Sequence, residues 1–282
     1  MTWVLPEVEI DRLIFEDAPA GDLTTSAMGI GGSIGRLSLA ARDQMCLAGV
    51  EVAAAMMRRV GLSVYLRAAS GEMLMPGAPI IAAEGPAEAL HLVWKSAKNL
   101  MESLSGVATA TRAMVDAARL VDPAVPVALT RKTFPGSRRL SQQAVLAGGG
   151  VIHRAGLSET VLVFAEHRAF AADLPLDLLA DRLRRAAPEE RLGIEVSTPA
   201  EAAEAVDAGF DIIQLEKFPL AEIVEVSRAA RKHAPGVLIA AAGGISPGNV
   251  ADVVRAGVGL IVTSWPYAAR PRDLATNFGP LA

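Results

Sequence analysis

The sequence predicts an α/β protein in which a separate α+β unit precedes an incomplete α/β barrel. Two patterns indicate this fold. From Val127 onward, short apolar runs alternate with amphipathic segments, whereas the first hundred residues hold strand-like pieces separated by turns. The length of 282 residues allows one barrel-sized domain or two smaller ones. A composition of 51% hydrophobic and 21% charged residues excludes a disordered or collagen-like chain.

Six apolar runs in the second part predict parallel strands, because strands that are apolar on both faces are covered by helices on both faces. The segments between them are long enough for crossover helices. Pro199 and Pro247 are expected at helix starts, with Thr198 and Ser246 as caps. The predicted strands are 127–130, 161–164, 192–196, 212–215, 237–241 and 260–263, and the predicted helices include 174–186, 199–208, 220–233 and 247–256.

The first hundred residues predict short strands at 36–41, 44–48, 62–68 and 79–83, with a helix over 52–60. A longer helix follows, because apolar residues recur there at spacings of three and four. Its apolar face is Leu90, Val93, Trp94, Ala97, Leu100, Met101 and Leu104. The dipeptide Ser105–Gly106 predicts an end or a bend of this helix.

Composition also restricts location and partners. The single cysteine, Cys46, excludes an internal disulfide and a thiolate metal site, which favours a reducing compartment. The first residues lack the basic and apolar regions of a signal peptide, and no apolar run approaches the ~20 residues of a membrane helix. We therefore expect a cytoplasmic protein without a membrane partner. A net charge of −4 and only twelve Phe, Trp and Tyr residues also argue against nucleic acid as a partner.

Positive charge is concentrated in one stretch. No acidic residue occurs between Asp122 and Glu159. The same stretch contains Arg131, Lys132, Arg138, Arg139, His153 and Arg154. This pattern predicts an anion nearby, and a solvated basic face is the alternative.

The active site of an α/β barrel lies at the carboxyl ends of its strands. Polar or small residues occur at every predicted strand end, although a random surface is also polar. They are Arg131–Lys132, Glu166–His167, Glu195, Glu216–Lys217, Gly243–Gly244 and Ser264. Guanidinium groups bind carboxylates and phosphates through two hydrogen bonds, so Arg131, Lys132, His153 and Arg154 suit a small polyanion.

Two further features predict phosphate chemistry. Gly243–Gly244 precedes an expected helix, so its backbone N–H groups can approach a phosphate, although a tight turn that needs glycine explains it equally well. Glu195 and Glu216 are expected to share the open end of the barrel, where they could hold Mg²⁺ through water beside a pyrophosphate. Salt bridges with Lys132 or Lys217 are the alternative.

The order of these residues resembles a known family. The motif Thr130–Gly136, followed by Ala144–Val145, Gly148–Gly150 and His153–Arg154, resembles the signature of quinolinate phosphoribosyltransferase, also called nicotinate-nucleotide pyrophosphorylase. The similarity extends to Glu16–Asp17, Gly21–Thr25, Leu104–Thr109 and Gly243–Ile245. The variant Phe164–Arg168 looks more like the molybdenum-transport-associated ModD branch of that family.

The resemblance implies a type II phosphoribosyltransferase fold. An N-terminal α/β sandwich of residues 1–107, to which 267–282 returns, would join an incomplete barrel of six or seven strands over 108–266. It also implies a homodimer or larger oligomer with a shared active site. Such enzymes use Mg²⁺ and phosphoribosyl pyrophosphate, join the ribose to the quinolinate nitrogen, release pyrophosphate and form nicotinate mononucleotide by decarboxylation.

Site residues follow from the same resemblance. Lys132, Glu195 and Glu216 are expected to be catalytic, and the two glutamates to lie on the metal side. The expected substrate-binding residues are Lys95, Thr130, Arg131, Lys132, His153, Arg154 and Phe164, and the expected phosphate-binding residues are Ala242, Gly243, Gly244 and Ser264.

Three departures bear on the substrate. Lys95 stands where the enzymes have an arginine from the neighbouring subunit, Phe164 where they have a lysine, and Glu216–Lys217–Phe218 where they have Asp-Asn-Phe. Two lost charged contacts, each worth about 1.5 to 3 kcal/mol, would weaken quinolinate binding strongly. We therefore expect a less anionic or larger aromatic acid as acceptor, linked to molybdenum metabolism as the branch suggests.

Two other functions are compatible with the sequence. The same basic site could hold an oxyanion or a nucleotide without catalysis, although an anion-binding protein gains nothing from carboxylates in its pocket. A sugar-phosphate isomerase would need a pair of side chains for acid–base catalysis, such as Glu166 and His167. Only fold analogy supports this function.

Overall fold

The computed structural model describes residues 5–281, and its contacts divide the chain into two compact units. The first contains the chain up to Arg112 together with 134–149 and the segment from Pro266 onward; the second contains 113–133 and 150–265. By sequence, 134–149 was predicted to belong to the barrel. In the structure, Leu140 and Ala144 of this segment pack in an apolar cluster with Leu104, which explains its place in the first unit.

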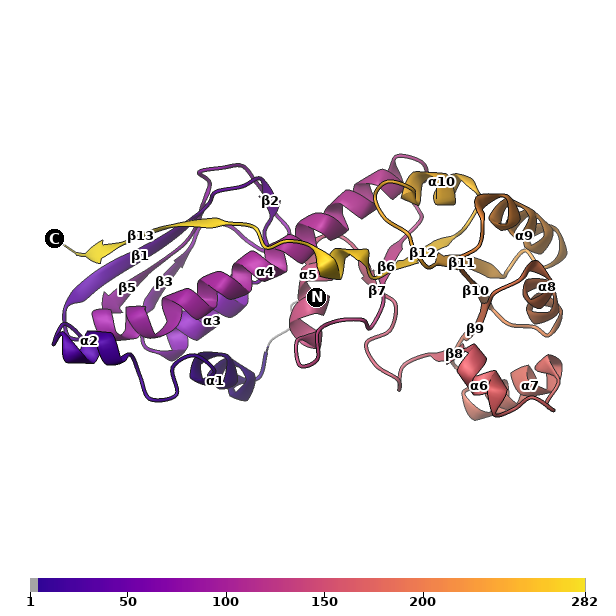
Figure 1. The fold of residues 1–282 in the computed structure, drawn as a ribbon, viewed down its shortest axis with the longest axis horizontal. Coiled ribbons are helices and arrows are strands. Elements are labelled where there is room, and N and C mark those ends of the chain that lie inside the picture. The colour runs from indigo at the N-terminus through magenta and orange to yellow at the C-terminus, as the bar shows by residue number, and fades with distance from the viewer. Residues whose placement is uncertain (1–4, 282) are drawn as a thin grey trace. The chain divides into compact units, whose positions relative to one another are not determined.

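The first unit is built on an antiparallel sheet with the strand order β13–β1–β5–β3 (Figure 1). Its strands are β1 (Ile34–Ala41), β3 (Ser63–Leu66), β5 (Pro79–Pro86) and β13 (Leu274–Pro280). Side chains of β1 alternate as expected for a sheet with one buried face, so Leu37 and Leu39 are buried while Arg36 is exposed. Because β13 pairs with β1 over its whole length, the C-terminal strand completes this sheet.

Helices cover the buried face of this sheet. The first unit contains α1 (Glu7–Phe15), α2 (Leu23–Ala27), α3 (Val50–Arg59), α5 (Arg138–Ala147), a small sheet of β2 (Met45–Cys46) and β4 (Met73–Leu74), and most of α4 (Ala87–Arg119). Met56 and Met57 of α3 and Leu90, Val93 and Met101 of α4 are fully buried in the same core as the β1 leucines. The apolar face predicted for the long helix therefore packs as expected.

The predicted end of α4 at Ser105–Gly106 is wrong, because the helix continues to Arg119. Both small residues serve tertiary contacts instead. The Ser105 hydroxyl accepts a hydrogen bond of 3.0 Å from the backbone N–H of Ala48. At Gly106 a side chain would collide with the backbone carbonyl of Arg270, so glycine allows that segment to pass close to the helix.

Several motif residues hold the first unit together. The Asp22 carboxylate caps α2 by accepting hydrogen bonds from its first backbone N–H groups. The Thr109 hydroxyl of α4 accepts a hydrogen bond of 2.9 Å from the N–H of Cys46. A Cβ atom at Gly148 would lie 2.5 Å from the carbonyl oxygen of Ala108, so this glycine allows the end of α5 to approach α4. These positions have structural roles.

The second unit is a curled sheet of seven parallel strands, which confirms the predicted incomplete α/β barrel (Figure 1). All six predicted strands are present. The seventh, β7, has only two residues and gives no apolar pattern. Within the described part of the chain no pairing joins β7 to β8, so the sheet stays open there. In sheet order the strands are β7 (Val151–Ile152), β6 (Val127–Leu129), β12 (Leu260–Thr263), β11 (Leu238–Ala242), β10 (Ile212–Glu216), β9 (Leu192–Val196) and β8 (Val161–Val163).

Helices lie on the outer side of this sheet. They are α6 (Ala165–Ala169), α7 (Leu176–Ala186), α8 (Pro199–Asp207), α9 (Leu220–His233) and α10 (Val250–Arg255). After β12, the 3₁₀ helix η1 (Trp265–Ala268) leads the chain back to the first unit. Thr198 caps α8 as predicted, since its hydroxyl accepts a hydrogen bond from the N–H of Glu201. The predicted helix start at Ser246–Pro247 is wrong. Asn249 accepts a hydrogen bond from the N–H of Ser246 and donates one to the carbonyl of Gly244, which forms a turn before α10.

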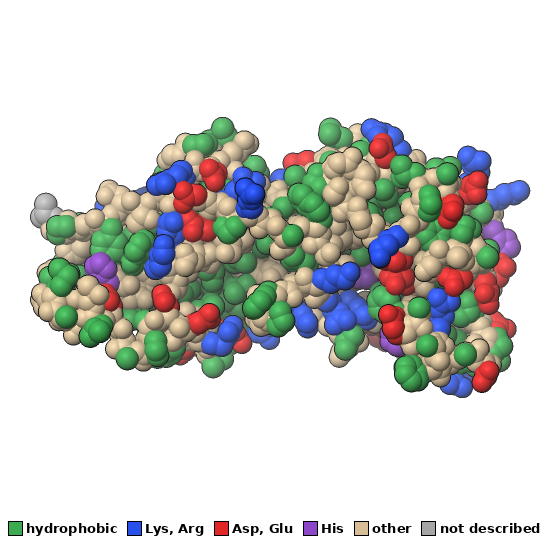
Figure 2. Space-filling model, in the orientation of Figure 1, with side chains coloured by type: hydrophobic (Ala, Val, Ile, Leu, Met, Phe, Trp, Pro, Cys, Tyr) green, Lys and Arg blue, Asp and Glu red, His purple; other side chains and the backbone are tan. Residues whose placement is uncertain are grey.

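The outer surface of this helical layer is charged. Figure 2 shows acidic and basic side chains mixed over α8 and α9. Nε2 of His233, in α9, lies 3.0 Å from Oδ1 of Asp207, in α8. Over residues 5–281, no helix combines the length and the apolar character that crossing a membrane requires.

Candidate active site

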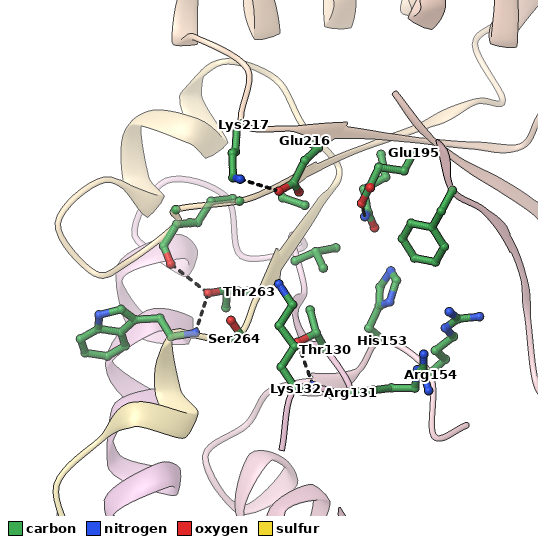
Figure 3. Close-up of a pocket in the computed structure, with 18 of the residues that line it drawn as sticks. Thr130, Arg131, Lys132, His153, Arg154, Glu195, Glu216, Lys217, Thr263 and Ser264 are labelled. Atoms are coloured by element: carbon green, nitrogen blue, oxygen red, sulfur yellow. Dashed lines mark hydrogen bonds and ion pairs between the residues drawn. The ribbon is translucent and has the colours of Figure 1, made fainter. Parts of the chain in front are cut away.

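A cavity of about 550 Å³ opens at the carboxyl ends of the seven parallel strands (Figure 3). Every strand of the sheet contributes to it, because parallel strands end on the same edge. Its lining residues are Thr130, Arg131, Lys132, His153, Arg154, Phe164, Glu166, Glu195, Gln214, Glu216, Lys217, Ala242, Gly243, Gly244, Ile245, Val262, Thr263, Ser264 and Trp265.

One side of the cavity carries positive charge without a counter-ion. Arg131 and Lys132 follow β6, and Arg154 follows β7. Within residues 5–281, none of these three forms an ion pair with a carboxylate. Arg154 is only 7% exposed, and burial, followed by the nearby charge of Arg131, lowers its pKa. Cations that are held together without partners are suited to binding an anion.

His153 lies beside these cations and favours the neutral imidazole. Burial lowers its pKa, and the charge of Arg154 lowers it further, whereas the neighbouring Gln214 amide opposes the shift. A neutral imidazole still donates one hydrogen bond, and an anion beside it would favour protonation.

Phe164 directly follows β8 and holds its aromatic ring against Arg154 and His167. The guanidinium carbon of Arg154 lies 5.5 Å from the ring centroid, a distance typical of a cation–π contact. Nδ1 of His167 accepts a hydrogen bond of 2.9 Å from the backbone N–H of Phe164, and the two rings stack 5.8 Å apart. His167 therefore positions Phe164 and does not line the cavity. Glu166 and His167 do not form the acid–base pair that an isomerase would need.

Glu195 and Gln214 form a polar pair on neighbouring strands. The register of β9 and β10 places these two residues directly beside each other. Gln214 Nε2 donates a hydrogen bond of 2.6 Å to Glu195 Oε2. Burial raises the pKa of Glu195, as do the charges of Glu216 and Glu166, while the Gln214 hydrogen bond and Lys132 oppose this shift.

Gln214 was absent from the sequence-predicted site. It is 4% exposed, lies among Ile212, Ile213 and Leu215, and is two residues before Glu216, so it is on the same face of β10 as Glu216. Alternation along the strand was the signal that could have identified it.

Glu216 and Lys217 lie at the end of β10, beside the Gly243–Gly244 turn. Lys217 Nζ lies 3.7 Å from Glu216 Oε1 (Figure 3). The Lys217 backbone has φ of 58°, and among the described residues it is the one non-glycine with positive φ. Its N–H donates a hydrogen bond of 2.8 Å to the carbonyl of Ala242, which fixes this conformation against β11.

The Gly243–Gly244 turn follows β11, and its conformation requires glycine. Both residues have positive φ, of 86° and 70°. The Thr263 hydroxyl donates a hydrogen bond of 2.8 Å to the carbonyl of Ile245 and accepts one of 3.1 Å from the N–H of Trp265, so it ties this turn to β12 (Figure 3). The predicted helix N-terminus directly after Gly244 is absent, and the turn itself faces the cavity.

The structure brings every sequence-predicted site residue into this cavity except Lys95. Lys95 is exposed on α4 in the first unit, with its Nζ 5.5 Å from the centroid of the Trp94 ring. Arg138 and Arg139 of the basic run begin α5 and do not line the cavity either. The acidic and basic side chains that the sequence predicted at separate strand ends therefore share one space.

Comparison with known proteins places the chain in one family. Residues 107–277 match the family model "Quinolinate phosphoribosyl transferase, C-terminal domain", and residues 22–105 match the corresponding N-terminal domain. Among curated proteins, "Putative pyrophosphorylase ModD" of Rhodobacter capsulatus is 42% identical over 90% of this chain and 98% of its own. The ModD protein of Escherichia coli O6:H1 is 38% identical over 99% of this chain and 98% of its own.

Proteins named as nicotinate-nucleotide pyrophosphorylase or as NadC also match. The carboxylating nicotinate-nucleotide pyrophosphorylase of Mycobacterium leprae is 34% identical over 95% of both chains. The crystal structure of NadC from Streptococcus pyogenes superposes with a TM-score of 0.90 over all of both chains, at 25% identity. These matches confirm both the family and the ModD branch that the motifs predicted. The chain belongs to the quinolinate phosphoribosyl transferase family of phosphoribosyltransferases.

Proposed function

We propose that this protein transfers the phosphoribosyl group of phosphoribosyl pyrophosphate to the ring nitrogen of an aromatic acid and releases pyrophosphate. The observation that carries the proposal is the cavity in which the unpaired Arg131, Lys132 and Arg154 face the carboxylates Glu195 and Glu216. Cations suit both anionic substrates, and carboxylates suit the positive charge that develops on the ribose. Relatives named as pyrophosphorylases support the same reaction.

In the proposed reaction the lone pair of the ring nitrogen forms a bond to C1 of the ribose. The bond between C1 and the diphosphate oxygen breaks, and its electron pair leaves with pyrophosphate. Arg131 and Arg154 would orient the acid through its carboxylate, and Lys132 would offset the charge on the leaving group. Glu195 would stabilise the oxocarbenium-like ribose. Positioning and electrostatics would supply most of the acceleration.

The acceptor is proposed to be less anionic or larger than quinolinate. Phe164 adds an aromatic surface where the related enzymes have a cation, and its ring already contacts Arg154. One fewer cation leaves a second carboxylate poorly neutralised. The link to molybdenum transport or metabolism that the ModD branch suggests remains part of this proposal.

Mg²⁺ fits the site only as an ion that is held largely by water and by the substrate. Glu195 and Glu216 line the cavity, but within residues 5–281 no group of three or more His, Cys, Asp or Glu side chains could hold a metal. This donor set suits Mg²⁺, which keeps several waters and shares phosphate oxygens. Bound there, the ion would offset negative charge on the diphosphate.

We further propose a homodimer or larger oligomer in the cytoplasm, in which Lys95 reaches the cavity of the neighbouring subunit. Its exposure and its absence from the cavity of its own chain are compatible with this role. A variant that remains monomeric should then lose activity although every residue of its own cavity is intact.

The test is pyrophosphate release from phosphoribosyl pyrophosphate and Mg²⁺ with a panel of pyridine carboxylates and related aromatic acids. At least one acid should give release, and Lys132→Met should abolish it while still binding the acid. Molybdate and sulfate are titrated in parallel. No release with any acid, together with tight oxyanion binding, would replace the proposal with a non-catalytic oxyanion-binding function.

A further inference from the structure

We propose that Lys217 binds a phosphate group of the activated ribose, an inference that rests on the proposed function. By the resemblance, an uncharged asparagine stands at this position in the related enzymes, so the positive charge is a departure of this chain. Lys217 lines the cavity beside the Gly243–Gly244 turn, and three independent observations support a ligand-binding role.

The first observation is the backbone conformation. A lysine with φ of 58° occupies a region that residues with a Cβ atom rarely adopt. Strain of this kind persists only where the surroundings impose it, and it is concentrated at functional sites. Here the imposed contact is the hydrogen bond of 2.8 Å from the Lys217 N–H to the Ala242 carbonyl.

The second observation is the space that Gly243 leaves. A Cβ atom at this position would lie 2.5 Å from Cγ of Lys217 and 2.9 Å from Oε1 of Glu216. Any other residue at 243 would displace the lysine side chain or its backbone. Gly243 therefore makes room for the first part of the Lys217 side chain, which packs against the glycine turn.

The third observation is the weakness of the existing ion pair. Lys217 Nζ lies 3.7 Å from Glu216 Oε1, beyond hydrogen-bond distance, and the lysine side chain is 77% exposed. Such a pair contributes little stability. The ammonium group keeps its donors available, and a phosphate group can replace Glu216 as its partner at little cost.

The phosphate has two sources in the same substrate, the diphosphate on C1 and the 5′-phosphate. Inorganic pyrophosphate and ribose 5-phosphate each carry one of them, and neither supports transfer alone. Calorimetric titration of the full chain with each compound therefore measures binding without turnover.

Three substitutions separate charge from backbone strain. Lys217→Met removes the charge, Lys217→Arg keeps it, and Lys217→Gly removes both the charge and the strain. Lys232→Met is the matched control, because Lys232 is an exposed lysine of α9 outside the cavity. Thermal melting of each variant reports whether the fold is intact.

We expect Lys217→Met and Lys217→Gly to weaken binding of at least one compound about five-fold or more, as the loss of one charge-assisted contact predicts. Lys217→Arg and Lys232→Met should stay within about two-fold of the unchanged protein. The compound that is affected identifies the phosphate. Equal binding by Lys217→Met and the unchanged protein overturns this inference alone, whereas an unchanged protein that binds neither compound overturns the proposed function with it.

Discussion

Gln214 donates a hydrogen bond of 2.6 Å from its amide to the Glu195 carboxylate, between the middle of β10 and the end of β9. This bond lowers the pKa of a carboxylate that burial and the charges of Glu216 and Glu166 raise. A buried glutamine thus keeps Glu195 closer to its ionised form, which is the form that can stabilise a positively charged ribose.

Gln214→Leu should reduce transfer at neutral pH about ten-fold, because one hydrogen bond to a charged group is lost and the pKa of Glu195 rises. The acid limb of the profile of kcat/KM against pH should move to higher pH. The profile is measured with the acid that the panel identifies. An unchanged acid limb, with activity lost at every pH alike, would contradict this role of Gln214 toward Glu195.

Glu195→Gln should abolish transfer, and it should raise the thermal stability of the substrate-free protein. The folded pKa of Glu195 lies above its ordinary 4.5, so ionisation costs folding free energy as the pH rises through that range. At pH 8 the glutamine variant should melt about 1 to 2 °C higher than the unchanged protein. At pH 4, below the ordinary pKa of 4.5, the carboxyl is mostly protonated in both folded and unfolded states, so the difference should largely disappear. A variant that melts lower at pH 8 would contradict this account of Glu195.

Binding of an aromatic carboxylate should strengthen as the pH falls from 8 to 6. The free protein holds the pKa of His153 below its ordinary 6.5, and a bound carboxylate favours the protonated imidazole, so acid binding takes up a proton. Titrations across this range should show the slope in the unchanged protein and a flat response in His153→Asn. The same slope in both proteins would assign the proton to another group.

Phe164→Lys should improve quinolinate binding about ten-fold, because it adds a cation beside Arg154 where a second carboxylate needs one. The control is Phe164→Leu, which removes the ring and adds no charge. Phe164→Leu should weaken binding of the acid that the unchanged protein prefers, and it should not improve binding of quinolinate. If both variants bind quinolinate equally well, the size of the side chain at position 164 sets the preference, and a positive charge there does not.

The sequence predicted the parallel sheet because strands that are apolar on both faces leave a local pattern. It also predicted most of the cavity. The carboxyl ends of parallel strands meet at one edge of the sheet, so the residues at the end of each predicted strand, or directly after it, are expected to line the site. Arg131, Glu195 and Gly243 were found in this way although they lie far apart in the chain.

The misplaced start of α10 reflects a local turn at Asn249, whereas the other errors concern features that depend on distant contacts. Gly106 was expected to end or bend α4, but the helix continues past it and Gly106 makes room for the backbone at Arg270. The hydrogen bond of Gln214 depends on the register between two strands, and the positive φ of Lys217 depends on Ala242. None of these contacts has a local signal in sequence. Two of them, the Gln214–Glu195 hydrogen bond and the Lys217 backbone conformation, concern residues on which the proposed chemistry depends.

The most direct test of the central claim is product analysis by mass spectrometry after incubation with phosphoribosyl pyrophosphate, Mg²⁺ and the acid that gives most release. A nucleotide of the acid should form in a molar amount equal to the pyrophosphate released, and neither should form with Lys132→Met. Pyrophosphate without a nucleotide would mean simple hydrolysis, and the absence of both from every acid would contradict phosphoribosyl transfer in this cavity.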